Sequence, residues 1–187
     1  KRAREELSSE LLEMFEPLLA CLEALSAKIT EYDKQIEKTC VENYPETQVL
    51  RNVQGVGAIT ALAYVLTLED PARFKKSRDV GPFLGLVPKR DQSGKVDKQL
   101  SITKAGNSTL RRLLVGSSQY ILGAFGPDCE LREFGLNLAA RGGKNAKKRA
   151  TVAVARKLAV MLHRLWVDEA VYQPFHQQIR EDMEQAA

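Results

Sequence analysis

The chain has 187 residues, of which 44% are hydrophobic and 28% charged, which suits a soluble protein with one core of ordinary size, or with a small domain and an appended element. No apolar run approaches the roughly 20 residues that a membrane span needs. No apolar core follows the basic start of the chain, which argues against a signal peptide. We therefore expect a cytoplasmic protein without a membrane partner. Three scattered cysteines and two histidines are too sparse for a structural zinc site.

The formal net charge of +4 hides a strong segregation along the chain. Residues 1–46 carry 6 basic and 11 acidic side chains, and residues 165–187 carry 1 and 5, whereas residues 89–164 carry 16 and 5. Because residues 89–164 are so basic, we expect them to bind a polyanion, with nucleic acid as the first candidate. The alternative is a solvated charged face that has no ligand.

Residues 5–39 carry the pattern of a coiled coil. Apolar side chains recur at alternating intervals of four and three residues, which gives a long helix with one apolar seam, and Pro45 ends it. Because the seam cannot be buried alone, we favour a homo-oligomer through residues 5–39, while packing against the chain's own body stays open. The seam residues are Leu11, Phe15, Leu18, Leu22, Leu25, Ile29, Tyr32 and Ile36.

Two glycines separate a pair of predicted helices between Val49 and Leu66. Gly55 and Gly57 permit a tight turn, and the second helix would point its unpaired N–H groups outward at its start. This arrangement resembles the helix-hairpin-helix motif, which grips a phosphate backbone without reading bases. An ordinary helical hairpin, whose glycines only allow close packing, explains the same pattern. Both interpretations remain open.

Residues 84–112 form the stretch richest in groups that suit phosphate. Turn residues around Ser93, followed by a loosely alternating run to Thr103, predict a small β-hairpin. A helix is then expected to begin near Asn107, where its dipole favours an anion. The candidate nucleic-acid-binding residues of this stretch are Lys89, Arg90, Lys95, Lys98, Lys104, Asn107, Arg111 and Arg112.

Two more helices are predicted at about residues 129–140 and 146–167. On the second, Arg149, Arg156 and Lys157 are spaced so that they share a face, and this basic stripe suits a phosphate backbone. The sequence therefore predicts a mainly α fold. We expect a coiled-coil arm over residues 1–45, a compact helical domain over residues 46–172 with a helix-hairpin-helix-like motif and the small hairpin, and an acidic tail over residues 173–187.

Ser93 is the candidate catalytic residue. A serine hydroxyl can attack a phosphodiester and conserve the bond energy in a covalent phosphoserine link, provided that cations hold the developing charge and a base takes the proton. Cations are abundant around Ser93, but no histidine lies in the stretch, and Asp91 and Asp97 are its only carboxylates near the serine. From spacing alone, the favoured interpretation is a turn serine that hydrogen-bonds locally.

Six short motifs follow one another along the chain: VQGVG (53–57), DPARF (70–74), LGLVP (84–88), QSG (92–94), ITKAGN (102–107) and VARKLA (154–159). In this order they resemble the C-terminal half of IS-one-ten type insertion-sequence transposases, relatives of the Piv invertase, over about residues 47–172. Ser101 departs from the pattern, since such sequences often have glycine there.

The resemblance implies DNA transposition or site-specific recombination, with Ser93 as the nucleophile. It also implies an N-terminal RuvC-like domain whose acidic cluster binds Mg²⁺. Because nothing in this chain matches that domain, we expect a part that holds no cofactor and is inactive alone. Some family members are guided by a structured RNA, which joins DNA as an implied partner. The alternatives are a non-catalytic helix-hairpin-helix module that binds DNA junctions and a coiled-coil adaptor with a basic body.

Overall fold

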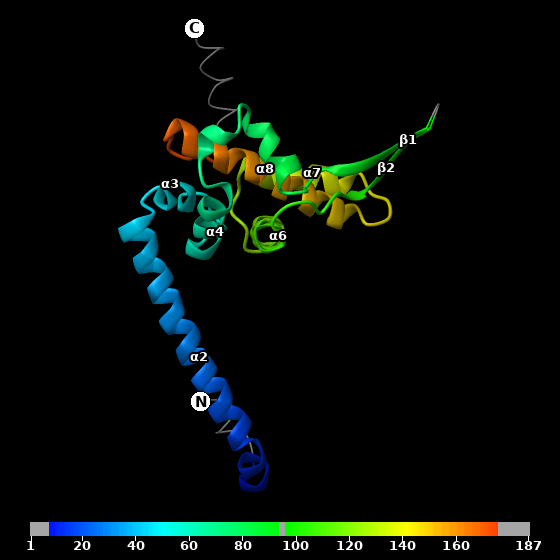
Figure 1. Ribbon diagram of the computed structural model, residues 1–187. Coiled ribbons are helices and arrows are strands. Elements are labelled where there is room, and N and C mark those ends of the chain that lie inside the picture. Colours follow the sequence, from blue (N-terminus) through cyan, green and yellow to red (C-terminus); the bar gives the residue numbers. More distant parts are fainter. Residues whose placement is uncertain (1–7, 94–95, 176–187) are drawn as a thin grey trace.

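The computed structural model describes residues 8–93 and 96–175, without the side chains of residues 91–99. A rod-like helix leads into a compact helical body, and a two-stranded hairpin projects from the body (Figure 1). The prediction of a mainly α fold is confirmed. Within the described ranges, no helix combines the length and the apolarity that would let it cross a membrane. The elements are α2 (Ser9–Asn43), α3 (Thr47–Arg51), α4 (Ala58–Leu68), η1 (Pro71–Arg73), η2 (Ser77–Asp79), α5 (Val80–Phe83), β1 (Pro88–Ser93), β2 (Val96–Ile102), α6 (Ser108–Leu122), α7 (Glu130–Ala140) and α8 (Ala146–Asp168).

Helix α2 is the long helix that the heptad pattern predicts. Its seam side chains from Leu11 to Tyr32 are 42 to 61% exposed, so the seam does not pack against the described part of the chain. Contact with the body is confined to the end of the helix, where Cys40 is buried. There Arg51 of α3 makes a double ion pair with Glu37, at 2.8 and 2.9 Å.

The core of the body is centred on α8, which packs against α3, α5, α6 and α7. Leu158 and Leu162 of α8 and Leu114 of α6 are fully buried. Tyr64 of α4 is also fully buried, and its hydroxyl donates a hydrogen bond to the Ala159 carbonyl at 2.6 Å. Burial raises the pKa of Tyr64 well above its ordinary value, so this phenol is a neutral donor that ties α4 to α8.

His163 fixes the segment between α4 and α5 against α8. Its ring is buried, with Nε2 3.0 Å from the Pro71 carbonyl oxygen and Nδ1 3.0 Å from the Ser77 hydroxyl. Because a carbonyl only accepts, Nε2 donates its N–H to the Pro71 carbonyl. The Phe74 ring meets the imidazole edge-to-face at 5.6 Å.

Strands β1 and β2 form the predicted hairpin. Their antiparallel register pairs Ser93 with Val96 at the outer end and Pro88 with Ile102 at the base, with an irregularity between Pro88 and Arg90. The base continues into the body through a hydrogen bond from the Thr103 N–H to the Val87 carbonyl at 2.9 Å. The hairpin therefore stands on the segment that leads directly into α6.

Candidate nucleic-acid interface

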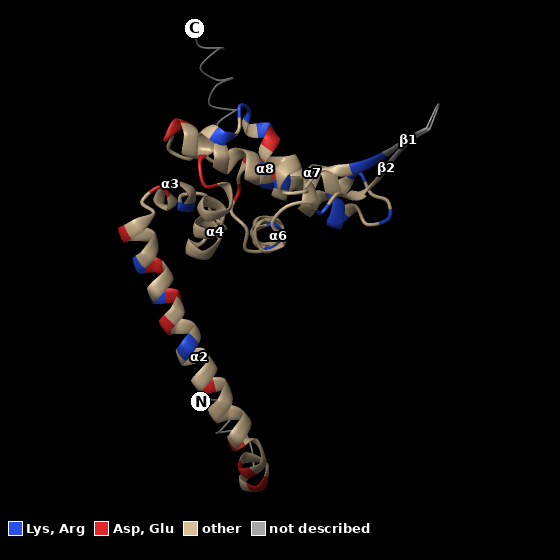
Figure 2. Ribbon diagram, viewed as in Figure 1, with Lys and Arg blue, Asp and Glu red and all other residues tan. Residues whose placement is uncertain are grey.

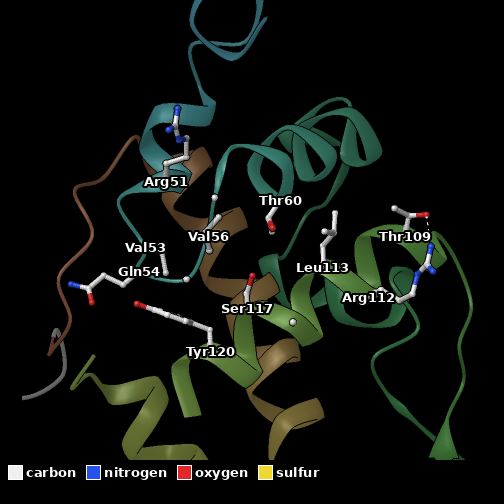
Figure 3. A pocket seen from close by; sticks show the side chains of 13 residues that line it. Arg51, Val53, Gln54, Val56, Thr60, Thr109, Arg112, Leu113, Ser117 and Tyr120 are labelled. Atoms are coloured by element: carbon white, nitrogen blue, oxygen red, sulfur yellow. Dashed lines mark hydrogen bonds between the residues drawn. The ribbon is translucent and has the colours of Figure 1, made fainter. Parts of the chain in front are cut away.

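The turn that contains Gly55 and Gly57 faces α6 across an open groove of about 790 Å³ (Figure 3). One wall consists of Arg51, residues 53–57 and Thr60 at the start of α4. The other wall runs along α6 from Thr109 to Tyr120. Val53 and Val56 are buried on the body side of the turn, so the turn is held against the core while its backbone borders the groove.

Gly55 and Gly57 play different structural roles in the turn. Gly55 has a φ of +89°, and a Cβ there would lie 3.0 Å from Cδ1 of Tyr120 and 3.3 Å from the Ser117 carbonyl oxygen. The turn can approach α6 this closely only without a side chain. Gly57 has a φ of −86° at the N-cap of α4, and a Cβ there would meet nothing within 4 Å. Gly57 therefore leaves the start of α4 unobstructed, without a side-chain cap.

The polar groups of the groove come from both walls. The hydroxyls of Thr60 and Ser117 point into the space between the walls, and Arg51 and Arg112 lie toward its ends (Figure 3). Arg51 is already paired with Glu37. Arg112 is exposed, and its guanidinium lies 3.4 Å from the Thr109 hydroxyl. Of these two groove cations, Arg112 is the one without a carboxylate partner in the described part of the chain.

Arg111 and Asn107 hold the start of α6 in place. The Arg111 guanidinium donates to the carbonyls of Leu84 at 3.0 Å and Ala105 at 2.7 Å. Asn107 caps the helix by accepting from the backbone N–H groups of Thr109 and Leu110. These contacts fasten the hairpin base to α6. The nearby Lys104 is exposed and has a φ of +59°.

The backbone of Ser93 and the β1 cations Lys89 and Arg90 lie apart from the groove. Lys89 and Arg90 are exposed on β1, and the backbone of Ser93 ends that strand. Lys98 pairs with Asp91 in the backbone register, the side chains of Ser93 and Lys98 are outside the description, and Lys95 lies outside the described residues. None of the described hairpin residues lines the groove. The structure therefore groups Gly55, Gly57 and Arg112, and keeps the end of β1 separate from them.

The three α8 cations that the sequence predicts to bind nucleic acid point to different neighbours. Arg149 donates to the Gly142 carbonyl at 3.1 Å. The stem of Arg156 lies against Gly81 of α5, where a Cβ would be 3.2 Å from the arginine Cγ. The Lys157 ammonium sits 4.8 Å from the centroid of the Phe134 ring of α7. Because α5 and α7 are separate neighbours of α8, these side chains do not form one row.

Basic residues lie on the described part of β1 and at the turn between α7 and α8, whereas α2 carries both signs (Figure 2). Among residues 8–93 and 96–175, no three His, Cys, Asp or Glu side chains are positioned to hold a metal ion together. The sequence did not point to Thr60, Ser117 and Tyr120 as groove residues. On α6, Ser117 and Tyr120 follow Leu113 at helical spacing, but that period does not say which face opposes the turn.

Residues 47–128 match the family described as Transposase IS116/IS110/IS902. A transposase for insertion sequence element IS1111A of Coxiella burnetii is 31% identical over 145 residues, which are 77% of this chain and 39% of that protein. A transposase for insertion sequence element IS1328 of Yersinia enterocolitica is 33% identical over 91 residues, 49% of this chain and 27% of that protein. A pilin gene-inverting protein of Moraxella lacunata is 28% identical over 138 residues, 71% of this chain and 41% of that protein. The chain spans less than half the length of each of these relatives.

Proposed function

Because this chain belongs to the IS116/IS110/IS902 family of transposases, we propose that it acts in DNA transposition or site-specific recombination, as the DNA-binding and serine-bearing part of a recombinase. The observation that carries the proposal is the family match over residues 47–128. That segment contains both walls of the groove and the hairpin, whose first strand, β1, ends at Ser93. The cytoplasm is the compartment in which such a reaction would run.

The groove is the proposed contact with the DNA backbone, in the manner of a helix-hairpin-helix motif. Three features of the groove support this role. The uncapped start of α4 offers backbone N–H groups and a favourable dipole. Gly57 leaves room for a phosphate to approach. Arg112 supplies a positive charge that no carboxylate of the described chain neutralises, and an arginine fork suits phosphate oxygens.

Replacing Arg112 by alanine is expected to weaken binding to a 30-base-pair duplex of arbitrary sequence by about fivefold at low salt. The slope of log affinity against log salt should fall by about 1, because one phosphate contact is removed. Fluorescence anisotropy across a salt series measures both quantities. The matched control is Lys38→Ala, which removes one charge from an exposed position of α2, where Lys38 pairs with Glu42 at 3.8 Å.

The control should bind within about twofold of the unmodified chain, because that charge lies on the arm. Equal losses in the two variants would mean that net charge, and not the groove, governs binding. An Arg112 variant that binds like the unmodified chain would overturn the groove as the contact.

Ser93 is the proposed nucleophile, supported by the family resemblance and by its backbone position at the end of β1, close in sequence to Lys89 and Arg90. Among the described residues, no cluster of His, Cys, Asp or Glu side chains could hold the Mg²⁺ that the family resemblance implies. The role proposed for Ser93 does not depend on that ion. A structured guide RNA is proposed on the resemblance alone. The alternative keeps the groove and gives Ser93 no chemistry, as in a DNA-junction-binding module.

Helix α2 is the proposed oligomerisation arm, with a second copy of the same helix as its partner. The exposed seam from Leu11 to Tyr32 supports pairing. In a parallel pair in register, Lys28 and Asp33 fall at heptad positions that meet across the interface, so a cation would face an anion. Two antiparallel helices centred on the same seam would instead set Asp33 near Leu12. The parallel pair is therefore favoured.

Introducing glutamate at Leu25, in the middle of the seam, is expected to raise the dimer dissociation constant at least about a hundredfold, because two leucines that the proposed dimer would bury are replaced by two charges. Sedimentation velocity over a range of concentrations measures the change. The control variant Ala27→Glu places the same charge on the outer face of α2, two residues away, and should leave association unchanged. A seam variant that sediments like the control would contradict the proposed arm.

A further inference from the structure

The turn between α7 and α8 is the most basic short segment that the proposed function leaves unassigned. Residues 141–149 contain five cations and no carboxylate. All five side chains are exposed. The five are Arg141, Lys144, Lys147, Lys148 and Arg149.

None of these five cations makes an ion pair with the described residues of the chain, in contrast to several other cations. Arg51 pairs with Glu37, Arg132 with Asp128 and Arg164 with Asp168. Five like charges on nine residues repel one another, and a polyanion relieves that repulsion while releasing its own counterions. The charge of the turn therefore favours a phosphate backbone as its ligand.

A hydrogen bond between residues of the turn itself helps to hold its conformation. Arg149 donates to the Gly142 carbonyl at 3.1 Å, one turn into α8. Asn145, the N-cap residue, gives no side-chain hydrogen bond to the start of the helix. The positive end of the α8 dipole thus adds to the charge of the lysines around it.

This surface is distinct from the groove. The described residues that line the groove belong to the segment from Arg51 to Thr60 or to α6. The α7–α8 turn lies at the end of the body from which the hairpin projects, away from α3 and α4 (Figure 2). We propose that residues 141–149 form a second contact with the phosphate backbone of duplex DNA. This inference rests on the proposed function and adds a second site to it.

The test replaces Lys144, Lys147 and Lys148 together by glutamine in the full chain, which removes the charge and keeps a polar side chain of similar helix propensity. Binding to the same 30-base-pair duplex should lose about 0.9 in salt slope for each contact removed, so up to about 2.7. The matched control replaces Lys75, Lys76 and Arg78 by glutamine. These are also three clustered, exposed cations, but Asp79 lies next to them in sequence, and they are on another part of the body.

The salt slope is expected to fall strongly for the turn variant and by less than about 1 for the control. When the turn variant is combined with Arg112→Ala, the two losses of affinity should multiply, since distant sites act independently. Equal slopes for the turn variant and the control would overturn the inference and leave the groove standing. No salt-dependent binding by the unmodified chain would overturn the proposed function and the inference together. A turn variant that loses binding to an RNA duplex but not to DNA, or that changes only self-association, would also overturn the assignment to DNA.

Discussion

Replacing Ser93 by alanine is expected to abolish the covalent protein–DNA adduct of a complete transposase that carries this segment. The serine oxygen would bond to phosphorus and displace a deoxyribose oxygen, and alanine has no atom that can do so. Removal of a nucleophile lowers the rate by at least about a thousandfold. The adduct is measured as labelled DNA that migrates with the protein on a denaturing gel.

Ser101→Ala is the matched control for this variant, because Ser101 is exposed on β2, the other strand of the same hairpin. The control should form the adduct at the normal level, and both variants should bind DNA within about twofold of the unmodified protein. An adduct that persists in the Ser93 variant would refute the nucleophile. Normal binding with no adduct from either variant or from the unmodified protein would favour the junction-binding alternative.

Replacing Gly106 by alanine is expected to cost about 3 kcal/mol or more of unfolding free energy. Gly106 has a φ of +70°, and a Cβ there would overlap the carbonyl oxygen of Phe83. Both the left-handed backbone and the contact with a rigid peptide group oppose the change. Urea denaturation measures the loss, with the m-value showing whether unfolding stays cooperative.

Gly142→Ala separates the two causes. Gly142 has nearly the same φ, +73°, but a Cβ there would meet nothing within 4 Å. Its replacement should cost only about 1 kcal/mol, the cost of the left-handed backbone alone. If the two variants lose equal stability, crowding against Phe83 contributes nothing, and the close packing of the hairpin base on the start of α6 is not what makes Gly106 necessary.

Those features that depend on neighbouring residues could be predicted from the sequence. The heptad spacing predicted α2, because a helical period repeats within a few residues. The capping role of Asn107 follows from the position of a short polar side chain just before an apolar helical run. The hairpin followed from turn chemistry around Ser93. Each of these signals lies within one element of the chain.

The roles of individual side chains in the site could not be predicted in this way. Arg111 and Arg112 are identical and adjacent, yet Arg111 is held by the Leu84 and Ala105 carbonyls and Arg112 borders the groove. The Leu84 carbonyl lies 27 residues away in sequence, so only the folded chain distinguishes the two arginines. From the sequence, His163 is one of only two histidines that could bind a metal. In the fold, both of its ring nitrogens make hydrogen bonds, to Ser77 and Pro71, which are 86 and 92 residues away.

The ion pair between Glu37 and Arg51 joins two parts of the molecule that have separate proposed partners. Arg51 lines the groove, and the carboxylate that holds it belongs to α2. If the groove binds DNA as proposed, a phosphate there would compete with the Glu37 carboxylate for the same guanidinium. By thermodynamic linkage, a position of α2 that weakens DNA binding in the groove must itself be disfavoured when DNA is bound, by the same free energy. A position that strengthens binding is favoured by the same amount. This one arginine thus gives the arm and the groove a route to reciprocal coupling.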